Sequence, residues 1–298
     1  MRGGWNRRLC RRLRTTLRSR GGAHEQEGGG KGEGQGWEAP HIPKLARDAG
    51  ARGHIPRMAD THCSRVLHTV RATIAARLPA HFRPAASGAT GTPPRLLDVG
   101  CWDGEGTVLY RDALGGAEAP AETHGIEVYP EPAAVAEARG IRVTALDLER
   151  DRWPYPDAHF DAVVCNQVLE HLKNIWLPLD ELARVTRPGG ILAISVPNLA
   201  SLHNRILLAL GRQPTSIRVV GPHVRGFALH EFLRLLRRGG RWEVLEVRGV
   251  GFPPLPVALG GVVARLWPGA CHTPVVICRR TGVRGEMGGE GDHQTYYG

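Results

Sequence analysis

The sequence has no paired cysteines and no long hydrophobic run. Its six cysteines include no CxxC pair and follow no regular spacing, which argues against a zinc site and against a disulfide framework. The longest apolar run, at 255–264, is half as long as the roughly 20 residues that a membrane span requires, and glycines interrupt it. We therefore expect a soluble protein of a reducing compartment, the cytoplasm, with no metal site and no transmembrane segment.

Little net positive charge remains once the N-terminal segment is set aside. The net charge is +10, from 39 Lys and Arg against 29 Asp and Glu, but residues 1–57 hold 13 of these basic residues and 5 of the acidic ones. The rest of the chain keeps 26 basic and 24 acidic residues, a net charge of only +2. A domain that binds nucleic-acid phosphates should cluster Lys and Arg on its folded part, so a nucleic-acid substrate is disfavoured.

Both ends of the chain are rich in glycine. Residues 1–57 combine arginines and glycines with few apolar residues, so burial cannot offset the entropy of ordering them. We expect a disordered basic extension there; a transit peptide and a nucleic-acid-binding arm are the alternatives. Composition changes at Met58, which makes Met58 a candidate translation start that intact-mass measurement would test. Residues 283–298 are expected to be a disordered tail, which leaves 58–282 as the folded domain.

Between these ends, short apolar runs alternate with helical patterns. This alternation is typical of βαβ units and predicts a doubly wound α/β fold with a mostly parallel sheet. The predicted strands span 95–99, 123–128, 141–146, 160–165, 191–197, 242–247 and 273–278. The predicted helices span 62–78, 105–115, 130–139, 175–187, 200–210 and 227–238.

Three features lie around the last predicted strands. RPGG at 187–190 is predicted to be a turn that leads into the fifth strand. Asn198 and His203 follow that strand and face either a substrate or solvent. The apolar segment 252–269 either packs in the core or covers a substrate or lipid carrier.

The first predicted strand runs into the loop LLDVGCWDGEGT, which contains Gly100 and Gly104. Glycines at a strand-to-helix turn let the backbone approach a ligand closely, because no Cβ intervenes. The spacing is not GxGxxG, which argues against a nicotinamide-dependent oxidoreductase. Acids at Asp98 and Asp103 suit a cationic ligand, such as a sulfonium with an attached amino group, better than a pyrophosphate.

Acidic residues also follow the next two strands. Glu127 ends the second, where a carboxylate can accept hydrogen bonds from both hydroxyls of a ribose. Asp147 follows the third and is placed to accept an adenine amino group, with Leu148 against the ring. Taken singly, Glu127 is equally well a solvated acid, and Asp147 a helix N-cap. Their shared position just past a strand favours an adenosine site.

The ordered segments LDVGCWDGEGT, GIEVYPE, DLE, FDAVVCNQVLEHL and RPGGILAISVPN resemble the motif series of class I S-adenosylmethionine (SAM) methyltransferases. The closest resemblance is to the methyltransferase type 11 and type 23 group, with a more distant one to MetW-like proteins. It is strong over 95–200 and weaker to 280. It implies a Rossmann-like seven-stranded sheet in the order 3-2-1-4-5-7-6, with strand 7 antiparallel. SAM would lie across the carboxyl ends of strands 1, 2 and 4.

The resemblance also implies which residues bind each part of SAM. The methionine half would be held by Asp98, Gly100, Asp103 and Gly104, the ribose by Glu127, and the adenine by Asp147 and Leu148. Asn166 and Gln167 would line the methionine carboxylate or the substrate side. Trp102 departs from the pattern, because many relatives have glycine there; its ring either covers the methionine portion or hinders the cofactor.

Methyl transfer from a sulfonium requires that donor and acceptor be aligned and water excluded. If the acceptor is a hydroxyl, a base near neutral pH helps, and His171 and His223 are the candidates, with a structural role as the alternative for each. The segment CNQVLEHL lacks the (D/N/S)PP(Y/F) motif of DNA amino-methyltransferases, which disfavours that activity.

We therefore expect a SAM-dependent methyltransferase of a small-molecule, sugar or glycolipid acceptor, with a hydroxyl as the favoured methylation site. The first rival is a non-catalytic pseudo-methyltransferase or partner subunit, an idea that Trp102 supports. The second is the nicotinamide oxidoreductase that the glycine spacing disfavours.

Overall fold

The computed structural model describes residues 62–82, 93–115, 120–253, 255 and 257–283. The predicted N-terminal extension and, apart from Val283, the predicted C-terminal tail lie outside these residues.

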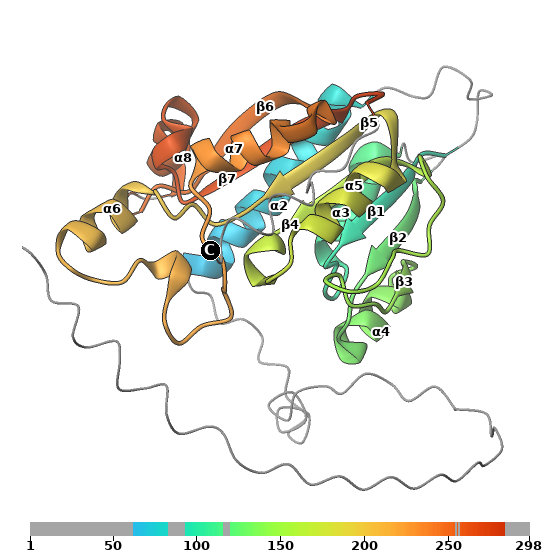
Figure 1. The fold of residues 1–298 in the computed structure, drawn as a ribbon, viewed down its shortest axis with the longest axis horizontal. Coiled ribbons are helices and arrows are strands. Elements are labelled where there is room, and N and C mark those ends of the chain that lie inside the picture. The colour runs from blue at the N-terminus through green and yellow to red at the C-terminus, as the bar shows by residue number, and fades with distance from the viewer. Residues whose placement is uncertain (1–61, 83–92, 116–119, 254, 256, 284–298) are drawn as a thin grey trace, which may run out of the picture. The chain divides into compact units, whose positions relative to one another are not determined.

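In the described part of the chain, seven strands form one sheet in the order β3-β2-β1-β4-β5-β7-β6 (Figure 1). Strands β1 to β5 pair in parallel, and β7 is antiparallel to both β5 and β6. This arrangement confirms the fold that the motif resemblance implied. The strands are β1 Arg95–Val99, β2 Glu122–Ile126, β3 Arg142–Thr144, β4 Phe160–Asn166, β5 Thr186–Ser195, β6 Trp242–Val250 and β7 Thr273–Arg280.

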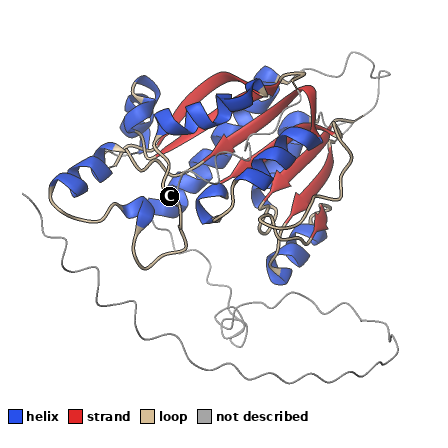
Figure 2. Ribbon diagram, viewed as in Figure 1, coloured by secondary structure: helices blue, strands red, loops and turns tan. Residues whose placement is uncertain are grey.

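Helices cover both faces of the sheet (Figure 2). The main helices are α2 His62–His81, α3 Glu105–Leu114, α4 Pro130–Ala138, α5 Trp176–Val185, α6 Leu202–Ala209, α7 Leu229–Arg237 and α8 Val257–Leu266. Side chains of α2 and α3 pack on one face and those of α5 and α7 on the other.

The central strand β4 shows why the sequence folds this way. Apart from Asp161, its run FDAVVC is apolar at successive positions, and successive side chains of a strand point to opposite faces. Ala162 and Val164 pack with α2 and α3, whereas Val163 and Cys165 pack with α5 and α7. A continuous apolar strand is therefore buried on both sides, as the centre of a parallel sheet requires.

The predicted turn at 187–190 was wrong in its placement, because β5 already begins at Thr186. Thr186 pairs with Phe160 and Ile191 with Ala162, so residues 187–190 bulge out between these two pairs. Gly189 has a φ of 79°, and a Cβ on Gly190 would lie 2.9 Å from the carbonyl oxygen of Asp161. Proline and glycine here shape a bulge inside the strand rather than a turn before it.

The apolar segment 252–269 contains the helix α8, which the sequence pattern did not predict. A small buried cluster is formed by Phe252, Ala264, Ala270 and Cys271. Part of this segment therefore packs in a core, which was one of the two alternatives. No helix in the described part of the chain is long and apolar enough to cross a membrane.

Candidate active site

Residues predicted from three separate motifs meet at one edge of the sheet. Val99 at the end of β1 is level with Ile126 of β2 and with Cys165 of β4. Glu127 follows β2 directly, and Asn166 ends β4. Because parallel strands share one carboxyl edge, the loops after β1, β2 and β4 surround the same space, which is where α/β sheets bind ligands.

The loop after β1 has a left-handed backbone at two predicted glycines. Gly100 has a φ of 73° and Gly104 of 77°. A Cβ would lie 2.6 Å from Val168 Cγ2 at Gly100 and 2.4 Å from Ile141 Cδ1 at Gly104. The protein's own packing therefore demands glycine at both positions, and the loop is fixed before any ligand arrives.

Asp98 is a buried acid at the end of β1. Its Oδ2 accepts a hydrogen bond of 2.6 Å from the Thr107 hydroxyl on α3. Burial raises the pKa of Asp98 to about 7, although this hydrogen bond and the charge of Arg71 lower it. A cationic ligand group near Asp98 would favour its ionised form.

Three carboxylates surround the Gly100–Gly104 loop. Burial raises the pKa of the Cys101 thiol, and the charges of Asp98, Glu127 and Asp103 raise it further. Asp103 also lies 3.6 Å from Arg139. An acidic cradle of this kind suits a ligand with an ammonium and a sulfonium centre, so the residues present fit SAM.

Glu127 is held in place by two backbone N–H groups. Trp102 N donates to Glu127 Oε2 and Tyr129 N donates to Oε1, each over 3.0 Å. The side chain is buried, yet each carboxylate oxygen keeps a further lone pair. The carboxylate is thus aimed by the protein backbone while retaining the capacity to accept two hydroxyls.

Trp102 occupies the glycine position of the motif with a strained backbone. Its φ is 51°, a region that a residue with a Cβ enters at a cost of about 1–3 kcal/mol. The ring lies edge-on to Tyr129, with centroids 6.0 Å apart, and is half exposed. The ring of Trp102 therefore lies beside Tyr129, and Tyr129 is two residues after Glu127, the predicted ribose ligand.

The predicted adenine residues lie in the loop after β3. Asp147 Oδ1 accepts a hydrogen bond of 2.9 Å from Glu149 N. Its carbonyl oxygen also accepts hydrogen bonds from Arg150 N and Asp151 N. Leu148 is partly buried against the main core. Asp147 thus organises a turn rather than capping a helix, the alternative considered for it, and its side chain stays partly exposed at the same edge of the sheet.

Asn166 and Gln167 are tied to the end of β5. The Ser195 hydroxyl donates to Asn166 Oδ1 over 2.6 Å. Gln167 Nε2 donates to the same Ser195 oxygen over 3.2 Å, and Gln167 has a φ of 58°. Ser195, which the sequence analysis did not single out, therefore positions both side chains.

The two candidate histidines are neighbours in space. Their ring centroids lie 4.8 Å apart at an interplanar angle of 75°. His171 Nδ1 lies 3.3 Å from the carbonyl oxygen of Pro222, and His223 Nδ1 lies 2.9 Å from that of Ser216. A carbonyl can only accept, so each Nδ1 carries the proton and each Nε2 is left as an acceptor.

Glu170 completes this cluster and was missed as a functional candidate. It lies in a 3-10 turn, Leu169–His171, with 1% of its surface exposed. Neither carboxylate oxygen has a hydrogen-bond partner among the described residues. Burial raises its pKa to about 8. Burial and the charge of His223 lower the pKa of His171.

One ligand atom from each of Glu170, His171 and His223 lies within 4.8 Å of the other two. These donor types at this spacing are ones that a divalent cation accepts. The loop after β5 brings His223 here, because Val224 N and Arg225 N both donate to the Glu170 carbonyl oxygen.

Asn198 is placed differently from either alternative considered for it. It is 1% exposed, and its Nδ2 donates to the carbonyl oxygens of Gly269 and Cys271. It therefore joins the segment after β5 to the segment before β7 and faces neither substrate nor solvent. His203 lies 2.7 Å from the Thr215 hydroxyl through Nε2.

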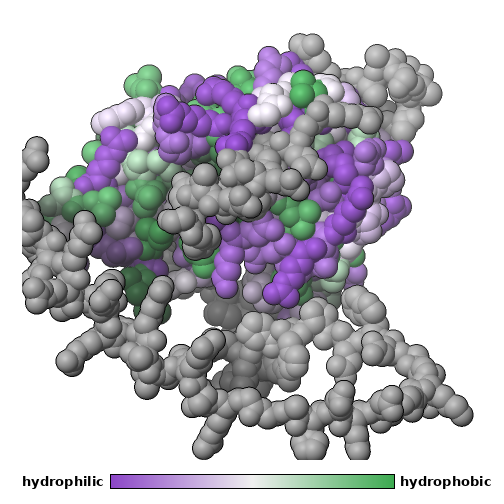
Figure 3. Space-filling view, in the orientation of Figure 1, coloured by the Kyte–Doolittle hydropathy of each residue, from purple (hydrophilic) through white to green (hydrophobic). Residues whose placement is uncertain are grey.

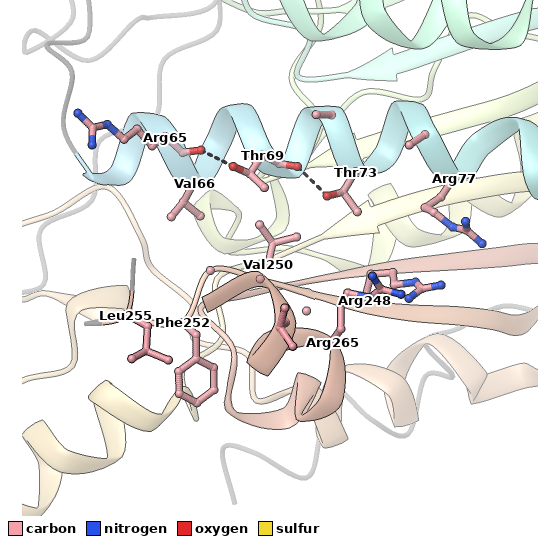
Figure 4. A pocket seen from close by; sticks show the side chains of 16 residues that line it. Arg65, Val66, Thr69, Thr73, Arg77, Arg248, Val250, Phe252, Leu255 and Arg265 are labelled. Carbon is pink, nitrogen blue, oxygen red and sulfur yellow. Dashed lines mark hydrogen bonds between the residues drawn. The ribbon is translucent and has the colours of Figure 1, made fainter. Parts of the chain in front are cut away.

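A cavity of about 570 Å³ lies outside this site, between α2, β6 and α8 (Figure 4). Val66, Val250 and Phe252 line it with apolar surface, and Arg248 and Arg265 add positive charge. None of the predicted cofactor residues or histidines lines this cavity.

Comparison with known proteins gives a consistent result. The methyltransferase 23 family model, described as a methyltransferase domain, matches residues 68–247. A Mycolicibacterium smegmatis protein described as a probable S-adenosylmethionine-dependent methyltransferase is 31% identical over 173 residues, 56% of this chain and 61% of that protein. The 27-O-demethylrifamycin SV methyltransferase of Amycolatopsis mediterranei is 32% identical over 118 residues, 36% of this chain and 42% of that one. The chain thus spans less than two thirds of either relative.

Among solved structures, a chain of the complex between the Haloferax volcanii Trm112 methyltransferase activator and a methyltransferase superposes with a TM-score of 0.50. It is 17% identical, and the match covers 73% of this chain and 91% of that one. At this identity the likeness concerns the fold alone.

The fold, the acidic glycine loop and the strand-end carboxylates match those of a class I SAM-dependent methyltransferase domain. The chain belongs to the methyltransferase 23 family, whose model covers more than half of it. This membership favours a SAM-dependent methyltransferase domain over the nicotinamide oxidoreductase.

Proposed function

We propose that this enzyme transfers the methyl group of SAM to a hydroxyl of a small molecule, with a sugar or glycolipid among the acceptors, and that His171 and His223 accept the hydroxyl proton. The observation that carries the proposal is the pair of neighbouring imidazoles after β4 and β5, each with its Nδ1 against a backbone carbonyl oxygen, which leaves Nε2 as the acceptor of a neutral ring. The name of the Amycolatopsis relative, a 27-O-demethylrifamycin methyltransferase, supports an oxygen acceptor on a small molecule.

The cofactor contacts follow from the loops already described. Asp98, Asp103 and the backbone at Gly100 and Gly104 would hold the methionine half. Glu127 would accept the ribose hydroxyls, and Asp147 with Leu148 would bind the adenine. Asn166 and Gln167 would face the methionine carboxylate or the acceptor. SAM supplies a methyl group on a positively charged sulfur, so the protein's task is alignment and the removal of one proton.

The two histidines are suited to that proton transfer. The Ser216 and Pro222 carbonyl oxygens fix the tautomers, so both Nε2 atoms can accept a proton. The lowered pKa of His171 keeps this ring neutral near pH 7. A neutral imidazole held in one orientation is an effective general base for a hydroxyl.

Glu170 is the third group of this cluster and adds no charge to it. Its raised pKa keeps the buried carboxyl protonated and neutral at pH 7. A neutral carboxyl within 4.8 Å of both imidazoles adds no buried charge to the pair. The proton taken from the acceptor can therefore remain on an imidazole next to Glu170 until solvent removes it.

An acceptor screen with methyl-labelled SAM tests this proposal. The panel would hold hydroxylated aromatics, sugars and glycolipids, each beside its amine analogue, with product mass spectrometry to locate the methyl group. We expect O-methylated products whose formation falls in His223→Ala. Methylation of the amine analogues alone, at rates unchanged in His223→Ala, would contradict the proposal.

A further inference from the structure

Charge is distributed unevenly over the second half of the fold. No Asp or Glu occurs between Glu181 and Glu231, or between Glu246 and Glu286. The first of these two stretches runs from α5 to α7 and includes α6, and the second includes α8. Both contain arginines, so every formal charge in them is positive.

Helix α6 and the loop after it expose aliphatic side chains. Ile206, Leu208 and Leu210 are each more than half exposed. In the loop, Val219 is 86% exposed and Val220 93%. Arg205 precedes these aliphatic residues in the sequence, and Arg212 and Arg218 lie between them. Aliphatic groups this exposed contribute nothing to the fold's own core, since they remain in water.

Helix α8 exposes a second set. Leu259 and Val262 are each 56% exposed, Leu266 is 82% exposed, and the next residue, Trp267, is half exposed. Arg265 is exposed in the same helical turn as Leu266. A tryptophan beside exposed aliphatic residues and an arginine is typical of a segment that meets the boundary between water and lipid.

The two sets belong to one face. Leu202 of α6 packs against the buried cluster that contains Ala264 of α8. Arg205 Nη2 also donates to the Gly269 carbonyl oxygen over 3.2 Å. Figure 1 shows α6 and α8 on the same side of the molecule, with α6 and its loop extending away from the sheet, and Figure 3 shows hydrophobic residues on this side. We call α6, the loop 210–220, α8 and Trp267 the α6–α8 face.

We propose that the α6–α8 face docks on an anionic lipid bilayer, with its aliphatic side chains inserted among the acyl chains and its arginines against the lipid headgroups. Exposed apolar side chains combined with charges of one sign match the chemistry of such a surface. The protruding α6 and its loop present these side chains outward, where they can enter a fluid layer. The proposal does not rest on the proposed function.

The charge pattern disfavours two other occupants. In a symmetric dimer through this face, the same arginines would oppose each other on both copies. A nucleic acid would satisfy the arginines, but it offers no apolar partner to Leu208, Leu210 or Val220, and aliphatic groups do not stack on bases as aromatic rings do. An anionic bilayer satisfies the arginines and the aliphatic residues together.

The cavity of Figure 4 adjoins this face. It shares Val262 and Arg265 with α8; Phe252 and Leu255 line one end of it, and Arg248, which pairs with Glu246, lies near Arg265. The cavity lining therefore adds apolar surface beside α8. The enzyme would lie on the bilayer surface, since no described helix can cross it.

Co-sedimentation of the full chain with vesicles tests the proposal. One vesicle type contains phosphatidylcholine alone, and the other contains 30% phosphatidylglycerol. We expect at least tenfold stronger partitioning to the anionic vesicles, weakened severalfold by 0.5 M salt. Equal partitioning to both vesicle types, or binding to neither, would overturn the proposal.

Matched variants locate the contact. Leu208→Glu and Leu266→Glu place a negative charge on exposed positions of α6 and α8, and we expect the double variant to lose at least tenfold in binding to anionic vesicles. Leu109→Glu on α3 is the control, because Leu109 is also an exposed leucine, far from this face in sequence. Circular dichroism checks that all variants fold. An equal loss in the control, or no loss in the double variant, would refute the assignment to this face.

Size-exclusion chromatography with light scattering separates self-association from lipid binding. We expect the same mass for wild type and the double variant in the absence of vesicles. A wild-type dimer that the double variant converts to a monomer would show that a second copy covers this face, and the lipid proposal would fail.

Discussion

The two halves of the sheet differ in the charge and the burial of the segments that they carry. The half formed by β1, β2 and β3 ends in a tight loop with buried carboxylates, Asp98 and Glu127, held by hydroxyl or backbone donors. The half formed by β5, β7 and β6 carries α6 and α8, which have no acidic residue and expose aliphatic side chains. One sheet therefore carries a closed acidic end and an open cationic one.

This difference matches what each half has to bind. A rigid, preorganised loop lowers the entropy cost of binding a cofactor of fixed structure. The glycine positions, which the protein's own packing sets, provide such a loop. Acceptors and partners vary within a family, and function is concentrated in the segments that connect the scaffold's elements. Between the two halves, β4 and the 3-10 turn after it carry Glu170 and His171, where methyl transfer would occur.

His223→Ala should have the largest effect. Loss of a general base typically lowers kcat by roughly 10²–10⁴-fold, and the dissociation constant for SAM should stay within about twofold, because His223 lies outside the cofactor loops. Steady-state kinetics on an identified acceptor, with calorimetry for SAM, measure both quantities. His230→Ala, an exposed histidine on α7, is the control. If a fall in SAM affinity accounted for the whole loss of rate, His223 would act in cofactor binding, and the separation of the two halves by function would be wrong.

Glu127→Ala tests the acidic half. Loss of a carboxylate that accepts two hydroxyls removes two charge-assisted hydrogen bonds, so SAM affinity should fall by about 100-fold, or about 2.7 kcal/mol. Calorimetric titration measures this change. Glu131→Ala on the exposed surface of α4 serves as the matched control and should bind SAM like the wild type. Unchanged binding in Glu127→Ala would contradict the ribose assignment.

Glu170→Gln tests the charge state of the residue between the halves. The ordinary pKa of 4.5 is raised to about 8 in the folded protein, so the folded state holds a proton that the unfolded chain loses. Wild-type stability should therefore fall as pH rises from about 4.5 to about 8, by roughly 2–4 kcal/mol, and level off above that.

Glutamine stays neutral throughout this range, so Glu170→Gln should lack this fall and gain stability relative to wild type as pH rises. Denaturant midpoints at pH 5 and pH 8.5 for both proteins measure the difference. Asp98 has a raised pKa of the same sign, but it is present in both proteins and cancels. A difference that is constant with pH would mean that Glu170 is ionised in the fold.

Trp102→Gly should have the smallest effect. Glycine relieves a left-handed backbone that costs about 1–3 kcal/mol. It also loses the contact with Tyr129 and has a larger entropy cost of ordering, so the net change in stability should be less than about 1 kcal/mol. The backbone N–H that holds Glu127 is retained, so SAM affinity should change less than about threefold. Thermal unfolding and calorimetry check both values. A tightening of thirtyfold or more would show that the ring hinders the cofactor.

The strands and the glycine loop were predictable because their signals are local, whereas the strand order followed only from the motif resemblance. Apolar runs such as FDAVVC predict buried strands, and the segment from Asp98 to Gly104 carries its ligand chemistry within a few residues. The bulge at 187–190 was placed wrongly, because Pro and Gly serve a turn and a bulge equally well. Helix α8 was missed, since its glycines weaken the helical pattern.

The histidine cluster could be predicted only in part. His171 and His223 were chosen singly, and nothing in the sequence indicates that they touch, because the contact depends on a loop that folds back onto the Glu170 carbonyl oxygen. Glu170 gave no signal of its own, because its burial is a tertiary property. Asn198 was misjudged for the same reason: its partners lie about 70 residues further along the chain.

Titration calorimetry of the full chain with SAM, S-adenosylhomocysteine and NADH tests the central claim most directly. The account predicts micromolar binding of both adenosyl ligands and no detectable binding of NADH, because the acidic cradle accepts a cation and repels a pyrophosphate. A well-folded protein that binds neither adenosyl ligand, or that binds NADH in their place, would contradict it.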